Sequence, residues 1–534
     1  MSGWMEPGFN PHAAMLTKPL AIIGRTSGIS ASLAAGALLC SAVPMAWLHA
    51  ELPPSPGNST NVLFINVDQM RFDAMSCAGS PYVSTPNLDR LAKEGVRFTN
   101  AMTAVPVCGP ARACWHTGLT GFKMGLVSNA QVDDPKVFLG NGSFDQSLAK
   151  SGYHTEFHGR WHSPASMLAC YENKVTPDYV TPYRNFLWAK LGEAPKPSPG
   201  QMAGEFSKWP VDLDLPAIAK SREANRNFTL QHGVETIPDE YTQTAWTASE
   251  TIDALKRLQG KRFSMTCSII APHTPWYVSK MMNGKVDPKM IRIPSTIDDK
   301  RENTPWPSPQ WWELDALERE HYALFAARYY EMVLMADYEI GRILKALDEL
   351  DLAKNTLVIF TADHGELLGE HGLQQKLLPY RGSVCVPMMM RLPGRIPAGK
   401  TIDNPVSSVD IFPTIFDYTG LPCPENDGLS LRPLIEGKKR AYPDFTFSEI
   451  GHDVTAYTMF VYRDWKYVWT HDDKVADMLF DLKNDLDETR NLLGNNPDRS
   501  RYADTVKRIR KDMLAWMERI HHPVRDQLAK FQAE

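Results

Sequence analysis

The sequence predicts an α/β fold in which helices flank a mainly parallel sheet, followed by a smaller C-terminal subdomain with an antiparallel sheet. Three short apolar runs rich in β-branched residues indicate buried strands, and each run ends near a polar side chain. Helical patterns between the runs provide the crossover connections that parallel strands require. Because parallel strands deliver their carboxyl ends to one edge of a sheet, we expect the functional site along that edge.

The predicted strands lie at 61–67, 263–270 and 356–361. Asp68 directly follows the first strand, His273 lies shortly after the second, and Asp363 lies shortly after the third. An acid at the end of a strand is common in turns, so neither acid is decisive by itself. Together, however, Asp68-Gln69 and Asp363-His364 supply two carboxylates, an amide oxygen and an imidazole, which can form a shell for one divalent ion beside the candidate nucleophile Cys108.

The segments between the strands differ in character. Residues 87–95, which end at Gly95, and residues 321–350 carry apolar side chains at helical spacing and are predicted helices. Residues 170–240 and 281–316 are rich in proline and poorly periodic. We therefore expect these two segments to be irregular and to form the rim of a substrate pocket.

Three tryptophans, Trp306, Trp311 and Trp312, fall in the second irregular segment. Their flat aromatic faces would suit sugar rings in a binding pocket. Packing beneath a long loop is the alternative.

After residue 440 the pattern changes to short alternating runs. The runs at 459–462 and 465–469 predict β-hairpins, and a closing helix is expected at 501–520. We therefore expect a catalytic domain at 59–440 and a C-terminal subdomain at 441–534.

Residues 1–50 have the layout of a secretory signal, because Lys18 and Arg25 precede an uncharged stretch at 26–50 that is rich in apolar and small residues. The stretch is near the length of a membrane span, so an uncleaved N-terminal anchor is the alternative. Both interpretations predict export to a periplasmic or extracellular location. Disulfides can persist there, but the spacing of the eight cysteines defines no pairing.

The composition is that of a folded globular protein. The chain has 534 residues, 43% of them hydrophobic and 22% charged, which is enough for one large domain and a smaller one. A formal net charge of -5 and the lack of a basic patch with interleaved aromatic residues argue against a nucleic-acid partner. The sequence does not define an oligomeric state.

The segment Cys108-Gly109-Pro110-Ala111-Arg112 carries the strongest functional signal. A cysteine, a proline two residues on and an arginine four residues on resemble the modification signature of the type I sulfatases, whose cysteine is oxidised after translation to formylglycine. The resemblance implies that the hydrated aldehyde at position 108, and not the thiol, is the nucleophile. For this segment alone, a buried structural cysteine is the alternative.

Further segments are similar to blocks of the same family and occur in the same order. They are the strand and acid pair at 61–69, the Asp-His-Gly run at 363–372 followed by Lys376, and residues 479–492. The chain is therefore identified as a member of the type I, formylglycine-dependent sulfatases of the alkaline phosphatase superfamily. The resemblance covers about residues 60 to 492 and implies an alkaline-phosphatase-like fold.

The resemblance implies one divalent metal ion held by Asp68, Asp363, His364 and the modified Cys108. Gln69 would be a weak ligand or a contact to the sulfate of the substrate. Gln69 and His364 replace the Asp and Asn of many relatives, which removes a carboxylate and adds a nitrogen. Ca²⁺ is expected from the family, with Mn²⁺ or Mg²⁺ as alternatives, and the added nitrogen moves the site towards manganese or another transition ion.

The resemblance also assigns catalytic roles. Arg112 would steady the hydrated aldehyde and the charges of the metal site, and Lys376 would neutralise sulfate oxygens as charge builds in the transition state. His273 would contact the ester oxygen or protonate the leaving alcohol, and His162 would be the base that releases sulfate. Arg160 stands where relatives carry lysine and is expected to bind the substrate. A structural role is the alternative for each histidine.

These residues predict an exported sulfatase that hydrolyses sulfate esters of glycans or small organic alcohols to alcohol and free sulfate. The expected partners are the sulfated substrate and a formylglycine-generating maturation enzyme. The same Asp-Gln and Asp-His pairs occur in choline sulfatases and phosphonate monoester hydrolases, so a phosphonate monoester or phosphodiester hydrolase is the enzyme alternative. An inactive glycan-binding protein is the alternative of another class, against which the retained Cys108 and Lys376 argue.

Overall fold

The structure, a computed structural model, describes residues 60–531 except 174, 179, 193–210, 215–231, 309, 311, 439–441, 452, 453 and 473. The predicted signal or anchor at 1–50 and Trp311 therefore lie outside the described residues. Within the described part of the chain, no helix combines the length and the apolar character needed to cross a membrane.

A seven-stranded sheet with the order β11-β2-β10-β9-β1-β7-β4 forms the centre of the fold. Its strands are β1 (Asn61–Val67), β2 (Val96–Phe98), β4 (His154–Gly159), β7 (Phe263–Ile269), β9 (Thr356–Ala362), β10 (Met388–Arg391) and β11 (Lys400–Ile402). β10 runs antiparallel to β9 and β2, and the other described pairings in this sheet are parallel. Every residue of β1, β7 and β9 is buried, which explains their continuous apolar runs. The predicted mainly parallel sheet is confirmed.

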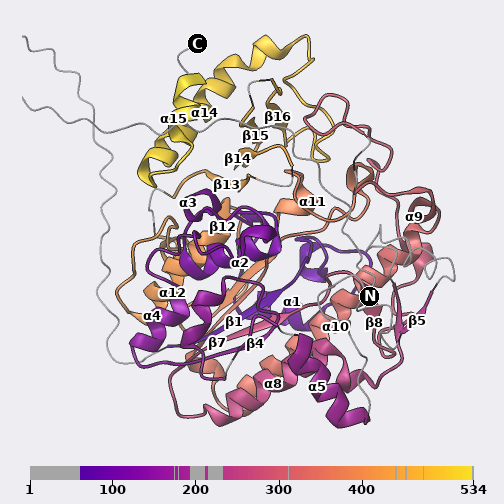
Figure 1. Cartoon of the computed structure of the whole chain (residues 1–534), viewed down its shortest axis with the longest axis vertical. Coiled ribbons are helices and arrows are strands. Elements are labelled where there is room, and N and C mark those ends of the chain that lie inside the picture. Colours follow the sequence, from indigo (N-terminus) through magenta and orange to yellow (C-terminus); the bar gives the residue numbers. More distant parts are fainter. Residues whose placement is uncertain are drawn as a thin grey trace, which may run out of the picture. The chain divides into compact units, whose positions relative to one another are not determined.

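Helices cover both faces of this sheet (Figure 1). The helices on one side are α1 (Pro86–Glu94), α8 (Gln243–Arg257) and α10 (Tyr322–Glu349), and those on the other are α2 (Cys108–Thr117), α4 (Phe144–Lys150) and α12 (Ile411–Thr419). Phe64 of β1 packs edge-on against Trp115 of α2 and Phe144 of α4. The two helices predicted from periodicity correspond to α1 and α10, within one residue at each end.

A small sheet and a helix correct the expectation of an irregular 170–240. The helix is α5 (Val180–Leu191), and the strands, in the order β5-β6-β8, are β5 (Val211–Leu213), β6 (His232–Glu235) and β8 (Trp276–Val278). The expectation was wrong for the described part of this segment, because α5 buries only Tyr183 and Leu187 and the strands are too short to show alternation. Between β8 and α9 (Ala316–Glu320), the described chain is irregular apart from the short 3-10 helix Pro288–Met290, as expected.

A four-stranded antiparallel sheet follows residue 441 (Figure 1). Its strands, in order, are β13 (Phe445–Ile450), β14 (Tyr457–Tyr462), β15 (Trp465–Thr470) and β16 (Met478–Asp481), and two helices follow, α14 (Ala503–Arg519) and α15 (Arg525–Phe531). The predicted hairpins and closing helix are confirmed. The core of this sheet includes Leu373, Leu378 and Val384, which lie in the segment after the Asp-His-Gly run. The domain boundary near residue 440 stays a prediction.

The described chain also contains short 3-10 helices, two further short strands and three further short α-helices: β3 (Ala101–Met102), β12 (Val406–Ser407), α3 (Gly121–Met124), α11 (Arg381–Val384) and α13 (Arg432–Ile435). Trp306 and Trp312 are 3% and 4% exposed and belong to the apolar core beside the C-terminal sheet, where the Trp306 ring lies 5.7 Å from the ring of Tyr457. The packing alternative therefore holds for both tryptophans. The seven cysteines of the described part are free thiols.

Candidate metal centre and active site

Two carboxylates meet at the edge of the central sheet. β1 and β9 are parallel neighbours, and Val67 pairs in register with Ala362. The residues that follow, Asp68 and Asp363, are therefore delivered side by side, and both are fully buried. This is the placement that the strand-end pattern predicts.

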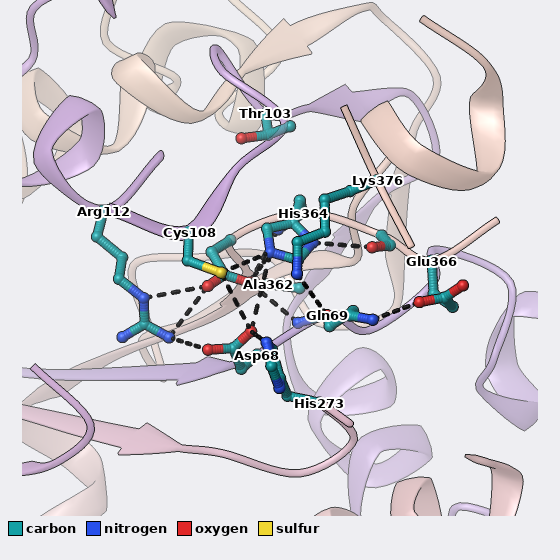
Figure 2. Close-up of polar contacts among 12 residues, drawn as sticks. Asp68, Gln69, Thr103, Cys108, Arg112, His273, Ala362, His364, Glu366 and Lys376 are labelled. Atoms are coloured by element: carbon teal, nitrogen blue, oxygen red, sulfur yellow. Dashed lines mark hydrogen bonds and ion pairs between the residues drawn. The ribbon is translucent and has the colours of Figure 1, made fainter. Parts of the chain in front are cut away.

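Cys108 completes the cluster from a different element, because it is the first residue of helix α2. Its Sγ lies 3.1 Å from His364 Nε2 and 3.9 Å from Asp68 Oδ1 (Figure 2). One ligand atom from each of Asp68, Cys108, Asp363 and His364 lies within 4.8 Å of the others, and all four residues are buried. The structure thus brings together the four residues predicted as metal ligands.

The donor set fits one divalent ion. His364 Nδ1 lies 2.8 Å from the carbonyl oxygen of Gly365, so in the neutral imidazole this nitrogen donates and Nε2 faces the cluster with its lone pair. Two carboxylates and an imidazole accept Ca²⁺, Mg²⁺ or Mn²⁺, whereas a thiolate at position 108 adds a soft ligand. Exchange of that sulfur for oxygen would make the set uniformly suited to these ions.

Gly365 has a packing reason to be glycine. A Cβ at this position would lie 1.9 Å from the carbonyl oxygen of Gly382, so no side chain fits without moving backbone. The close approach brings the Asp-His-Gly run against the turn at α11 and fixes the direction of His364.

Arg112 lies one helical turn after Cys108 and binds both carboxylates. Its Nε is 3.0 Å from Asp363 Oδ2 and its Nη2 is 2.9 Å from Asp68 Oδ2. Its Nη1 donates to Ser268 Oγ and to the carbonyl oxygen of Arg160, each at 2.8 Å. Arg112 therefore lies where it can balance the charges of the metal site, as the family resemblance implies.

Arg160 follows β4 and is 3% exposed. Its Nη1 lies 2.6 Å from Asp68 Oδ2, and its Nη2 lies 3.1 Å from His162 Nδ1. The guanidinium therefore joins a metal-site carboxylate to one of the two predicted catalytic histidines. Its predicted contact with substrate stays a prediction.

The other predicted catalytic residues surround this cluster. His273 Nε2 lies 4.0 Å from Asp68 Oδ1. The ammonium of Lys376 donates to Gln69 Oε1 at 2.8 Å and to Gln375 Oε1 at 3.3 Å. Figure 2 shows Lys376, Gln69 and His273 around the group formed by Cys108, His364 and Asp68.

The two carboxylates have pKa values shifted in opposite directions. Burial raises the pKa of Asp68, but Arg160 and His273 outweigh it and hold this pKa below its ordinary value. Burial and the neighbouring Asp68 charge raise the pKa of Asp363. The like charge of Asp68 is therefore one reason why Asp363 resists ionisation, and a cation near both carboxylates would offset this repulsion.

Position 108 lies in electropositive surroundings. Burial opposes ionisation of the Cys108 thiol, but Lys376, His364 and Arg160 outweigh it and hold the pKa of the thiol well below its usual range. The amino-terminal end of α2 adds the positive end of a helix dipole. Such surroundings favour an anion at this position, whether a thiolate or the oxygens of a bound ester.

Several non-glycine residues of the site adopt left-handed backbone conformations with positive φ. They are Gln69 (64°), His162 (44°), Gln375 (71°) and Leu377 (86°). Conformations of this kind are costly and persist where surrounding structure enforces them, often at functional sites. The cluster of such residues here agrees with a preorganised site.

Two buried polar residues at the site have no role assigned from the sequence. Ser268, near the end of β7, accepts from Arg112 and donates to the carbonyl oxygen of Arg160 at 2.6 Å. Glu366 is fully buried and accepts a hydrogen bond from Gln69 Nε2. The available signals were a serine inside an apolar strand and an acid directly after the Asp-His-Gly triplet.

A family model described as Sulfatase matches residues 60–421 of the chain. The chain belongs to the sulfatase family. A second model, described as the C-terminal part of N-sulphoglucosamine sulphohydrolase, matches residues 369–519, a span that includes Lys376 and the C-terminal sheet. The predicted family and the predicted enzyme class, a sulfuric ester hydrolase, are confirmed.

Individual relatives of this chain support the assignment to the sulfatase family. An arylsulfatase from Clostridium perfringens (strain 13 / Type A) is 29% identical over 486 residues, which cover 86% of this chain and 94% of the relative. A protein solved in complex with its substrate D-glucosamine-2-N,6-O-disulfate has 22% identity and a TM-score of 0.66, covering 88% of this chain and 99% of the other. The phosphonate monoester hydrolase of Agrobacterium radiobacter has 23% identity and a TM-score of 0.70, covering 86% and 96%. The two structural likenesses confirm the alkaline-phosphatase-like fold.

Proposed function

We propose that this sulfatase-family protein is an exported, formylglycine-dependent sulfatase that releases sulfate from sulfated sugars. The observation that carries the proposal is the buried cluster of Asp68, Cys108, Asp363 and His364, with ligand atoms within 4.8 Å of one another. A thiol is a poor choice for a structural ligand of a hard ion, whereas an aldehyde hydrate at this position offers both a ligand and a nucleophile.

The proposed reaction begins with maturation of residue 108. A two-electron oxidant used by the maturation enzyme, together with one water, would convert the CH₂–SH group of Cys108 to an aldehyde and release the sulfur as sulfide, and a second water would add to give two hydroxyls. One hydroxyl attacks the sulfur of the bound ester and gives up its proton to water. The bond from sulfur to the alcohol oxygen breaks, and His273 protonates the leaving alcohol. The sulfate is then esterified to residue 108.

Release of sulfate uses the second hydroxyl. We propose that His162, whose Nδ1 lies 3.1 Å from Arg160 Nη2, takes the proton of this hydroxyl. The bond from carbon to the sulfate oxygen breaks, the aldehyde re-forms and sulfate leaves. A serine or an unmodified cysteine has no second hydroxyl and would stop at the ester. This difference gives the physical reason for the modification.

A divalent ion held by Asp68, Asp363, His364 and residue 108 would lower the pKa of the attacking hydroxyl and offset charge on the sulfate oxygens. We propose Ca²⁺ from the family, with Mn²⁺ or Mg²⁺ as alternatives, of which the imidazole of His364 favours Mn²⁺. Lys376 and Arg112 would add fixed positive charge on the substrate side and the carboxylate side respectively.

The proposed substrate class is a sulfated sugar. Support comes from the relative solved with a sulfated glucosamine, and the long segment between β8 and α9 is the proposed rim of the pocket. The buried Trp306 and Trp312 do not contribute to that rim. The proposed export rests on the composition of residues 1–50 alone.

A phosphonate monoester hydrolase is the second candidate, because Gln69 and His364 belong to the pairs found in that branch and the fold matches such an enzyme. The two ester classes are similar in shape but differ in charge, so relative turnover decides between them. The protein, produced together with its maturation enzyme, should hydrolyse an aryl sulfate and a sulfated glucosamine faster than an aryl phosphonate monoester. A dominant phosphonate rate that persists across the divalent ions named above would refute the sulfatase proposal.

A further inference from the structure

Gln69 lies between a cation and a buried carboxylate. Figure 2 shows its side chain with a contact to Lys376 on one side and to Glu366 on the other. The ammonium of Lys376 can only donate hydrogen bonds, so the atom of Gln69 that faces it must be the amide oxygen. The amide nitrogen of Gln69 must therefore face Glu366, and it needs an acceptor there.

The backbone fixes Glu366 in the matching orientation. Glu366 Oε1 accepts from the backbone nitrogens of Leu368 at 2.9 Å and Gln375 at 2.5 Å. Its second oxygen, Oε2, is left to accept from Gln69 Nε2. Glu366 and Gln69 are both fully buried, so water does not compete for these positions.

We infer that Glu366 is a positioning residue that turns the amide oxygen of Gln69 toward Lys376 and so sets the place of the Lys376 ammonium. Lys376, Gln69 and Glu366 form a relay in which each hydrogen bond has only one workable direction. The inference rests on the proposed function in one respect, because Lys376 is there the cation that neutralises the sulfate oxygens. Glu366 does not itself touch the substrate.

Glu366→Gln tests this relay with almost no change in shape. The two backbone N–H groups hold the oxygen of the new amide, so its NH₂ group faces Gln69 Nε2. Two donors then oppose each other, and Gln69 must flip to present its oxygen to residue 366. The flip points the Gln69 NH₂ group at the Lys376 ammonium, which loses its 2.8 Å contact with Gln69, keeps only the longer contact with Gln375 Oε1 at 3.3 Å, and moves away from residue 69.

The double variant Gln69→Glu with Glu366→Gln should restore the relay with its polarity exchanged. The NH₂ group of residue 366 donates to one oxygen of the new carboxylate, and Lys376 donates to the other. The summed charge of the two positions is unchanged. Gln69→Glu alone places two carboxylates against each other and should impair the site, so the two substitutions should rescue each other.

Asp410→Asn is a matched control outside the site. Asp410 is also buried and accepts two backbone hydrogen bonds, from Ser407 at 2.8 Å and Leu429 at 2.7 Å, and one from a side chain, Tyr442 Oη, at 2.5 Å. The same chemical change there has a comparable effect on stability. It touches neither Gln69 nor Lys376.

The experiment combines crystal structures with kinetics of the mature protein. In the wild type and the double variant, Lys376 Nζ should lie within hydrogen-bond distance of residue 69, and in Glu366→Gln it should lie beyond about 3.5 Å. With an aryl sulfate, kcat/KM should fall about 10- to 100-fold in Glu366→Gln and stay unchanged in Asp410→Asn, whereas the double variant is judged by the position of Lys376, because Gln69 itself belongs to the site.

The inference is overturned if Lys376 keeps its contact in Glu366→Gln, or if this variant loses no more activity than Asp410→Asn. If Glu366→Gln does not fold, the double variant decides: a folded protein with the Lys376 contact supports the relay, and an unfolded one refutes it. Failure of the proposed function is a separate result, because the crystallographic shift of Lys376 does not depend on which ester is cleaved.

Discussion

The candidate metal ligands and Lys376 lie at the same site, but different kinds of contact hold them there. Asp68 and Asp363 follow adjacent parallel strands, so the hydrogen-bond register of β1 and β9 places them together. Lys376 lies in a segment outside any described strand or helix, between the Asp-His-Gly run and α11. Backbone hydrogen bonds hold this segment, from Leu367 N to the carbonyl oxygen of Gln375 at 2.8 Å and from Leu377 N to that of Pro106 at 3.3 Å, and side-chain contacts from distant parts of the chain add to them.

The C-terminal sheet supplies those contacts. Tyr457 Oη of β14 donates to the carbonyl oxygen of Leu377 at 2.7 Å, and Lys466 Nζ of β15 donates to that of Pro379 at 2.6 Å. Glu488, which pairs with Lys466, accepts from the backbone nitrogen of Arg381 at 2.9 Å. The comparison indicates that the sheet edge builds the metal site, while the C-terminal sheet holds the segment that carries Lys376.

The largest effect should come from the sheet-edge region. Cys108→Ala should fold like the wild type but lose turnover of an aryl sulfate by about 10⁴-fold or more, because the nucleophile is gone. Cys114→Ala, a change in a buried cysteine of the same helix, is the control and should retain activity. If Cys108→Ala hydrolysed the aryl sulfate at the wild-type rate, another residue would be the nucleophile.

The next effect tests the C-terminal support. Lys466→Met leaves the Glu488 carboxylate buried without its partner, so the free energy of unfolding should fall by about 3–5 kcal/mol. At temperatures where the variant is folded, kcat/KM should also fall, because the segment beside Lys376 is released. Urea unfolding and steady-state kinetics measure the two effects.

Lys123→Met is the control for this comparison, because Lys123 pairs with the buried Asp427 at 2.7 Å and does not touch the Lys376 segment. It should lower stability but leave kcat/KM unchanged. Equal kinetic effects of the two lysine variants would contradict a special role of the C-terminal sheet.

A pH effect of intermediate size is expected at His471, which directly follows β15. Burial and the nearby His522 lower the pKa of His471 from 6.5 to about 3, so this histidine is neutral in the folded protein. Above pH 6.5 the histidine is neutral in both states and its contribution to stability is fully present. As the pH falls from 6.5 toward 3, the unfolded chain binds a proton that the folded protein does not, so the free energy of unfolding decreases, by about 2 kcal/mol at pH 5. Urea unfolding at pH 7 and pH 5 should show a smaller loss for His471→Gln, and an identical pH dependence would refute this assignment.

The smallest effect is expected for Tyr457→Phe. Loss of the hydroxyl leaves the carbonyl oxygen of Leu377 without this donor and should cost about 1 kcal/mol of stability and a few-fold in kcat/KM. Tyr153→Phe removes a similar hydrogen bond, from Tyr153 Oη to the carbonyl oxygen of Thr60 at 3.0 Å, far from Lys376. A kinetic effect as large in the control would show that the loss is not specific to the segment.

The central sheet could be predicted from the sequence because its strands are buried on both faces and read as continuous apolar runs. β1 has the predicted bounds, and β7 and β9 differ by one residue each. The placement of Asp68 and Asp363 followed from the same pattern. α5 was missed because its two buried side chains give too little periodicity.

The support of Lys376 could not be predicted in the same way. The contacts from Tyr457 and Glu488 join residues that are 80 and 107 positions apart, and no local pattern links them. The role of Glu366 depends on the direction of hydrogen bonds, which is set by Lys376 on the far side of Gln69. Residue types alone carry neither kind of information.

The central claim is that residue 108 acts as formylglycine, and the mass of the peptide that contains it is the most direct test. After production with the maturation enzyme, the account predicts that this peptide loses a sulfur and two hydrogens and gains one oxygen relative to the encoded cysteine. The same peptide from Cys114→Ala should show the same change in addition to the substitution. An unmodified thiol at position 108 in every active preparation would contradict the account.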